Sequence, residues 1–323
     1  MTVLRYPPPR LAIVVPCYNE AEVFTYCQQE LGKLLDEMKK DLLIQADSYL
    51  LFVDDGSKDT TWEQIAAASS RIPCVQGLKL SRNVGHQSAL LAGLEAARPD
   101  ADAIVSIDAD LQDDITAIPK MVQAYREGYD VVYGVRASRE SDTWFKRSTA
   151  EGFYRLMSVM GVKQVFNHAD FRLLSQRALS GLLEYSERNA YIRGLVPLVG
   201  FPSTEVYYAR GLRTAGESKY PLRKMLALAV EGITSMTISP LRMIAYLGFC
   251  ISILSLGATA YILVLKLTGH TIAGWSSVML SIFFMGGVQM LSLGIIGEYV
   301  GKIYIEAKKR PRSHIESHVR HDG

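Results

Sequence analysis

Two aspartates separated by a single residue follow a strongly apolar stretch near the middle of the chain. The segment "ADAIVSIDADLQDD" (101–114) predicts a buried strand that ends on Asp108 and Asp110. Side chains two residues apart in an extended chain point to the same side, so these carboxylates would repel each other. A divalent cation would remove that repulsion, although solvated acidic turns show the same pattern. Asp113 and Asp114 are interpreted as the start of the next helix, where carboxylates suit the positive end of the dipole.

Three other strand-like segments end on polar residues in the same way. They are "LAIVVPCYNE" (11–20), "SYLLFVDDGS" (48–57) and "YDVVYGVR" (129–136). Helical patterns lie between such strands, for example over residues 20–40, and this alternation predicts an α/β fold with a doubly wound, mainly parallel sheet. Ligands of such sheets bind beyond the carboxyl ends of the strands. We therefore expect the polar strand ends to meet in one site.

The composition narrows the class of protein only slightly. The chain has 323 residues, of which 49% are hydrophobic, with 35 Lys and Arg against 33 Asp and Glu. A net charge of +2 gives no indication of a nucleic-acid partner. The four cysteines lie far apart without metal-site spacing, which predicts reduced thiols in a chain facing the cytosol. The first ten residues lack an apolar core, so no cleavable signal peptide is expected.

Two segments near the carboxyl end are apolar enough to predict membrane spans. Residues 243–265 and 275–297 are free of charged side chains, and a span needs about 20 apolar residues. Buried core helices are the alternative. The segment between them is too short for a domain, so the two would form a hairpin. Basic residues before the first span and after the second place both ends in the cytosol.

These patterns predict four parts of the chain. They are a cytosolic catalytic domain (1–220), an amphipathic juxtamembrane linker (221–241), two transmembrane helices (242–301) and a basic cytosolic tail (302–323). Segments 144–161 and 220–237 have the composition of amphipathic interfacial helices, and packing against the domain's own sheet is equally open. The glycines of the second span, including Gly286, Gly287 and Gly294, would allow close helix packing in a homo-oligomer.

An ordered set of motifs gives a more specific resemblance. The segments are "VVPCYNEAE", "VDDGSKDTT", "SRNVGHQSALLAGLEAA", "DADLQDD", "ADFRLLS" and "GESKY". Their order resembles that of family 2 glycosyltransferases with the GT-A fold, and most of all that of the polyprenyl-phosphate glycosyltransferases. This group includes bactoprenol glucosyltransferases, the undecaprenyl-phosphate aminoarabinose transferase and dolichyl-phosphate mannose synthases. The resemblance extends to "SPLRM" and "GEYVGKIY", which flank the predicted spans.

The resemblance implies roles for individual residues. Asp108, Asp110 and Gln112 would hold Mg²⁺ or Mn²⁺ on the donor diphosphate. Asp170 would be the catalytic base, or would orient an acceptor that is already ionised, or would only pair with Arg172. The implied nucleotide-sugar site comprises Pro16, Tyr18, Glu20, Asp54 and Gly85, with turn capping as the alternative for Asp54. His86 is assigned no catalytic role.

An anionic acceptor and a diphosphate also need cations. Arginine suits bidentate phosphate contacts and lysine acts as a point charge. We expect Arg136 and Arg147 to bind the acceptor phosphate, and Arg213 and Lys219 to bind the diphosphate.

The predicted function is an inverting transfer of a hexose, glucose in the first instance, from a UDP-sugar to undecaprenyl phosphate. The expected location is the cytosolic face of a bacterial cytoplasmic membrane, for cell-envelope glycan modification. Another donor, such as an aminoarabinose, GlcNAc or GDP-mannose donor, is an alternative. Less favoured are a processive polysaccharide synthase, since the chain has no QxxRW motif, and a non-catalytic membrane assembly protein.

Overall fold

A computed structural model describes residues 6–136, 168–187, 191–208, 238–268 and 274–321 of the chain. The chain divides into two compact units. Residues 1–155, 163–220 and 310–323 form the first, which we call the sheet unit. Residues 156–162 and 221–309 form the second, which we call the hairpin unit.

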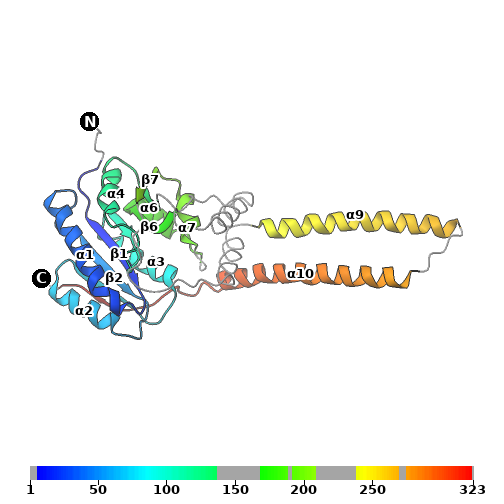
Figure 1. Ribbon diagram of the computed structural model, residues 1–323, viewed down its shortest axis with the longest axis horizontal. Coiled ribbons are helices and arrows are strands. Elements are labelled where there is room, and N and C mark those ends of the chain that lie inside the picture. Colours follow the sequence, from blue (N-terminus) through cyan, green and yellow to red (C-terminus); the bar gives the residue numbers. More distant parts are fainter. Residues whose placement is uncertain (1–5, 137–167, 188–190, 209–237, 269–273, 322–323) are drawn as a thin grey trace. The chain divides into compact units, whose positions relative to one another are not determined.

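The sheet unit is built on one mixed sheet of eight strands in the order β7-β5-β6-β4-β1-β2-β3-β8 (Figure 1). The strands are β1 Leu11–Cys17, β2 Tyr49–Asp54, β3 Val75–Leu80, β4 Ala103–Ser106, β5 Val131–Arg136, β6 His168–Ser175, β7 Ser203–Tyr208 and β8 Ile315–Val319. The pairs β1–β2, β1–β4 and β2–β3 are parallel, and β5 is parallel to β7. Strands β6 and β8 are antiparallel to their neighbours. The predicted α/β alternation is thus confirmed over β1 to β5.

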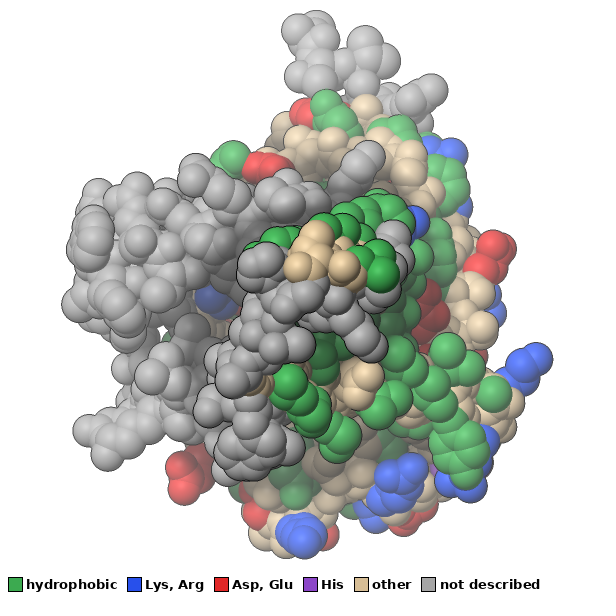
Figure 2. Space-filling model, turned by 90° about the vertical axis from the view of Figure 1, so that its right-hand side faces the viewer, with side chains coloured by type: hydrophobic (Ala, Val, Ile, Leu, Met, Phe, Trp, Pro, Cys, Tyr) green, Lys and Arg blue, Asp and Glu red, His purple; other side chains and the backbone are tan. Residues whose placement is uncertain are grey.

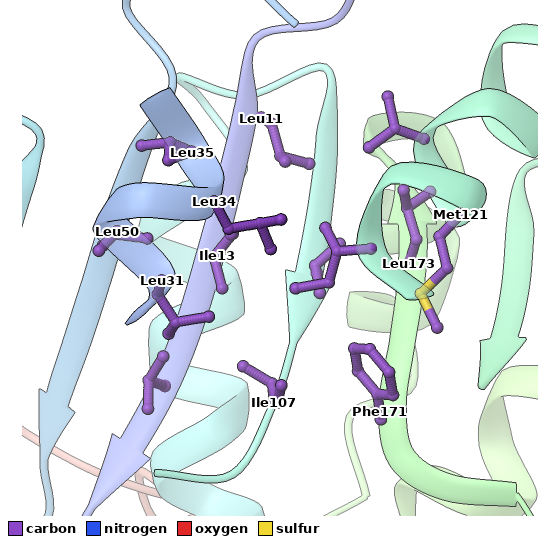
Figure 3. Close-up of a cluster of buried hydrophobic side chains, with 14 of the residues drawn as sticks. Leu11, Ile13, Leu31, Leu34, Leu35, Leu50, Ile107, Met121, Phe171 and Leu173 are labelled. Carbon is purple, nitrogen blue, oxygen red and sulfur yellow. The ribbon is translucent and has the colours of Figure 1, made fainter. Parts of the chain in front are cut away.

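Helices cover both faces of this sheet. They are α1 Ala21–Lys40, α2 Thr61–Arg71, α3 His86–Ala97, α4 Ala117–Arg126, α6 Gln176–Leu183 and α7 Ile192–Leu195, with a 3-10 turn at Val196–Val199. On one face, leucines of α1 pack against Leu11 and Ile13 of β1, and Phe171 and Leu173 of β6 lie close to Met121 of α4 (Figure 3). These side chains form a continuous apolar core between the helices and this face of the sheet.

The opposite face of the sheet receives α3. Gly93 lies so close to β1 and β2 that an added Cβ would be 2.6 Å from Val14 Cγ1 and from Val53 Cγ2. A glycine at this position therefore allows the helix to approach the strands. Since α3 begins at His86, this packing fixes where its first turn lies at the edge of the sheet.

The segment predicted as a basic tail contributes a strand to the sheet unit. Strand β8 pairs antiparallel with β3, with Gly77 opposite Val319 and Leu78 opposite His318. Lys79 Nζ lies 2.9 Å from a carboxylate oxygen of Glu316. The segment that follows the hairpin thus returns to the sheet and covers the edge of β3.

The hairpin unit contains two long helices, α9 Ser239–Leu267 and α10 Trp275–Ala307. Many large hydrophobic side chains of both helices are exposed, and the face in Figure 2 shows hydrophobic side chains at its surface. Among the residues that the structure describes, no helix has a stretch both long and apolar enough to cross a membrane. The two predicted spans therefore stay a prediction, although both segments are helical.

Candidate active site

The loops that follow β1 and β2 are locked together by hydrogen bonds. Asn19, at a positive φ of 54°, donates its backbone N–H to Ser57 Oγ at 3.0 Å and accepts from the Lys58 N–H at 2.8 Å. The Glu20 N–H donates to Thr61 Oγ1 at 2.9 Å. Tyr18 and Glu20 thus flank a hydrogen-bonded loop junction, and Tyr18 is 41% exposed.

Asp54 and Asp55 at the end of β2 are both buried and serve the backbone of neighbouring loops. Asp54 accepts from the Ser57 N–H at 3.3 Å, the turn interaction that was the alternative to nucleoside binding. Asp55 accepts from the N–H groups of Val84 and Gly85 at 2.7 and 2.9 Å. It therefore anchors the loop before α3, which the sequence alone did not indicate.

The acidic motif follows β4 as predicted. Asp110 accepts from the Gln112 side-chain amide at 2.5 Å and from the Gln112 N–H at 3.3 Å. Leu111 between them has a positive φ of 44°, which is rare for a branched side chain and found where a site constrains the backbone. The turn thus holds Asp110 and Gln112 as a unit next to Asp108.

The charge around this turn is suited to a cation. Burial raises the pKa of Glu20, and the carboxylates of Asp110 and Asp108 raise it further. The pKa of Asp108 is also raised, first by burial and then by Asp170, Asp110 and Asp113, with His86 opposing the shift. Oxygen ligands with unrelieved mutual repulsion fit Mg²⁺ or Mn²⁺, for which one or two carboxylates suffice. No group of three or more His, Cys, Asp or Glu side chains with metal-site geometry occurs among the described residues.

Asp170 lies near the start of β6, just beyond the end of β4, because Ser106 of β4 is opposite Arg172 of β6. The Ser106 hydroxyl donates to the Asp170 carbonyl oxygen at 2.6 Å. Arg172 Nη2 donates to Asp170 Oδ1 at 2.6 Å. Arg193 donates through Nε to Oδ1 at 3.1 Å and through Nη2 to Oδ2 at 3.0 Å.

These two guanidinium groups determine the charge of Asp170. Burial alone would raise the pKa of this carboxyl, but Arg172 and Arg193 outweigh it and hold the pKa well below its usual range. Such a carboxylate is a weak proton acceptor. The pairing with Arg172 that the sequence left open is present, and the arrangement favours an orienting role over that of a base.

His86 connects the two acidic groups. Its Nε2 lies 3.5 Å from Asp108 Oδ1 and 3.8 Å from Asp170 Oδ2. Sequence reasoning gave His86 no role and did not identify Arg193. Arg193 is 23 residues beyond Asp170 and belongs to no recognisable motif, so only the fold brings the two together.

Arg136, predicted to bind the acceptor phosphate, ends β5 and is paired with Asp113. Its Nε and Nη2 lie 3.0 and 2.9 Å from Asp113 Oδ1, which also accepts from the Tyr208 hydroxyl at 2.7 Å. The prediction that Asp113 starts the next helix is wrong, since α4 begins at Ala117 and Asp113 is buried as a partner of Arg136. Asp114 instead accepts from the Thr116 N–H at 2.9 Å.

Of the remaining site residues predicted from the sequence, two lie in the described part of the chain and three lie outside it. Pro16 is buried in β1 opposite Val53. Gly85 precedes α3 at a φ of 90°. Arg147, Arg213 and Lys219, together with the predicted amphipathic segments 144–161 and 220–237, lie outside the described residues.

Comparisons with known proteins show the family to which the chain is related. Residues 12–183 match glycosyl transferase family 2, and residues 239–303 match the GtrB C-terminal hairpin. The uncharacterized glycosyltransferase YkoT of Bacillus subtilis is 53% identical over 95% of this chain and 91% of its own length. Bactoprenol glucosyl transferase of Shigella phage SfX is 36% identical over 95% and 99%, respectively.

Among solved structures, mannosyl-3-phosphoglycerate synthase from Rubrobacter xylanophilus gives a partial match. It is 16% identical, with a TM-score of 0.47, over 69% of this chain and 71% of that chain. The family match covers β1 to β6 with the acidic turn and Asp170. The chain therefore belongs to glycosyl transferase family 2.

Proposed function

We propose that this protein transfers glucose from UDP-glucose to undecaprenyl phosphate. The similarity to a bactoprenol glucosyl transferase over nearly the whole of both chains carries the proposal. It includes the hairpin as well as the sheet unit, so it goes beyond the transferase domain alone. The juxtaposition of an acidic turn with a pair of arginines supports it, because donor and acceptor are both anions.

The reaction is a single in-line displacement. A phosphate oxygen of the acceptor attacks the anomeric carbon of glucose, the bond from that carbon to the diphosphate oxygen breaks, and UDP leaves. A donor with an α-linked sugar would give a β-linked lipid. The second ionisation of a phosphate monoester has a pKa of about 6, so the acceptor needs little help to lose its proton near neutral pH.

Asp108, Asp110 and Gln112 would hold a divalent cation against the donor diphosphate. Such an ion stabilises the negative charge that develops on the leaving diphosphate. The role of the chain is to fix these side chains: Gln112 and Asp110 hold each other, and the preceding strand aligns Asp108. Tyr18 and Glu20 are proposed to contact the nucleoside beside them.

We also propose that the hairpin unit inserts into the bacterial cytoplasmic membrane with the sheet unit in the cytosol. Support comes from the two uncharged segments, 243–265 and 275–297, and from the exposed apolar side chains of α9 and α10. A lipid acceptor presents its phosphate at the membrane surface. The proposed spans and the predicted homo-oligomer can be tested by glycan-tagging of the loop at 268–274 and by cross-linking.

Incubation of the purified full-length protein with radiolabelled UDP-glucose, Mg²⁺ and undecaprenyl phosphate tests the function directly. The expected product is a lipid-extractable, Mg²⁺-dependent glucose conjugate. Parallel reactions with UDP-GlcNAc, GDP-mannose and an aminoarabinose donor identify the sugar. Absence of lipid-linked sugar with every donor would refute the enzyme proposal, and a long polymer would identify a processive synthase.

The variant Asp110→Asn separates the metal role from folding. Asp110 is exposed, so the substitution should leave the melting temperature within a few degrees of wild type while transfer falls at least about 100-fold. Asp114→Asn, which changes a carboxylate of the same segment outside the proposed metal site, is the matched control. Near-normal activity of Asp110→Asn would contradict the metal role.

A further inference from the structure

The Asp170 cluster, defined as Asp170, Arg172 and Arg193, contains one carboxylate and two guanidinium groups. Its formal charge is therefore positive by one unit, although it lies beside the acidic turn. His86 is within 4 Å of both Asp108 and Asp170, at 3.5 and 3.8 Å, so the cluster and the turn adjoin. A site for a cation and a site suited to an anion thus lie next to each other.

The two arginines of the cluster differ in access to solvent. The side chain of Arg172 is 2% exposed, so its guanidinium is buried inside the protein. The side chain of Arg193 is 38% exposed. Of these two arginines, Arg193 is the one that a substrate can reach without displacing the core.

The carboxylate fixes the direction of the Arg193 guanidinium. Two parallel hydrogen bonds, 3.1 and 3.0 Å long, use its Nε and one Nη2 proton against the two Asp170 oxygens. A bidentate pair of this kind fixes the plane and the direction of the guanidinium. The buried Arg172 in turn holds Asp170, with a hydrogen bond of 2.6 Å.

We propose that Arg193 binds the phosphate of the lipid acceptor and that Asp170 is the positioning residue that orients it. This inference rests on the proposed function, because it specifies the acceptor side of the same site. The phosphate would lie between the Arg193 guanidinium and the anomeric carbon of a donor held at the acidic turn. Asp170 then acts through Arg193 and takes no proton from the acceptor.

The test uses Arg193→Gln and Arg193→Lys in the full-length protein. The Michaelis constants for undecaprenyl phosphate and for UDP-glucose are measured separately, together with the melting temperature. Arg193→Gln should raise the acceptor KM about 10- to 100-fold and leave the donor KM within about twofold. Lysine keeps the charge but loses the bidentate fork, so Arg193→Lys should give an intermediate acceptor KM.

Arg177→Gln is the matched control. Arg177 also makes a bidentate pair with a buried aspartate, Asp130, but on α6 and outside the proposed site. The Arg177→Gln variant should have a lower melting temperature than the wild type, with an unchanged ratio of the acceptor KM to the donor KM. If Arg193→Gln behaves like this control, Arg193 is only structural and the proposal is overturned.

Asp170→Asn tests the positioning role. It should raise the acceptor KM as Arg193→Gln does, and the double variant should be no worse than the worse single one, because both act on the same contact. Independent effects that multiply in the double variant would contradict the proposal.

A binding measurement separates this inference from the proposed function. Calorimetric titration with a short polyprenyl phosphate, citronellyl phosphate, needs no sugar transfer. If the wild type makes no lipid-linked glucose but binds this phosphate, and Arg193→Gln weakens binding at least tenfold, the function fails and the inference stands. Equal binding by both proteins, or none by the wild type, would overturn the inference whatever the activity.

Discussion

The ionisation of Asp170 predicts the pH dependence of the reaction. Because two guanidinium groups hold the pKa of Asp170 well below its usual value, the carboxylate stays charged from pH 5 to pH 9. Of this carboxylate and the acceptor phosphate, it is the phosphate whose charge changes in this range. At saturating Mg²⁺, kcat/KM for the acceptor should rise as the pH increases through about 6 and then level off.

Asp170→Asn should keep this profile at a lower rate, and an acidic limb that disappears in the variant would identify Asp170 as a base instead. The same pKa has a consequence for stability. A depressed carboxyl pKa stabilises the fold above its usual value near 4, and this contribution is lost as the pH falls toward the folded-state pKa. Chemical denaturation at pH 7 and pH 3 should show Asp170→Asn approaching the wild type at the lower pH.

Alanine substitutions at two glycines with positive φ separate the cost of steric crowding from the cost of backbone strain. An alanine Cβ at Gly56, φ 66°, would lie 2.6 Å from the Arg82 carbonyl carbon and from the Asn83 nitrogen. At Gly85, φ 90°, no atom lies within 4 Å of the same Cβ. Gly56→Ala should destabilise the protein by about 2–4 kcal/mol and Gly85→Ala by about 1–2 kcal/mol.

Equilibrium denaturation of both variants measures this difference. If both variants lose the same free energy of unfolding, the backbone at Arg82 and Asn83 can move away from the added Cβ with little energetic cost. Gly56 and Gly85 lie in the loops after β2 and β3, which Asp55 connects by hydrogen bonds. A large decrease in the free energy of unfolding for Gly56→Ala would also show that these two loops are tightly packed against each other.

Strand β8 should be required for a stable sheet edge. Its removal would expose the backbone groups of β3 and the apolar contacts of Val319 near Gly77. Deletion of residues 313–323 should lower the melting temperature by at least about 5 °C, whereas deletion of 322–323 alone should have no effect. Equal melting temperatures of the two truncations would show that β8 adds nothing to stability.

Individual elements show what sequence patterns can and cannot predict. Strands β1 and β2 are continuous apolar runs, and the helical periodicity of α1 is regular, so the sequence predicts these three elements. Strand β8, "IESHV", has no such pattern, because its conformation depends on pairing with a strand more than 200 residues away. Likewise the acidic turn was evident from spacing, whereas the Arg193–Asp170 pair depends on the position of α7.

At the scale of the whole molecule, the hairpin should be separable from the catalytic chemistry. Truncation after Ser239 would also remove β8, so the better variant replaces residues 239–307 with a Gly/Ser linker of about 25 residues, which spans on average about 25–30 Å. This variant should bind UDP and transfer glucose to citronellyl phosphate. It should lose membrane association and use undecaprenyl phosphate at least tenfold less efficiently than wild type.

Fractionation of cells and kinetics with both acceptors measure these effects. A linker as long but inserted after Ala307, with the hairpin kept, is the control for the added chain. Wild-type use of undecaprenyl phosphate by the replaced variant would contradict a role of the hairpin in lipid access.

The order of the chain gives β8 a consequence for biosynthesis. Strand β3 emerges from the ribosome early, but its partner β8 is translated only after both hairpin helices. Until then the edge of β3 is open to pairing with other chains. The sheet unit can reach its final form only after the hairpin has been synthesised. A nascent chain that stalls within the hairpin would therefore carry an incomplete sheet, which chaperones and proteases can recognise.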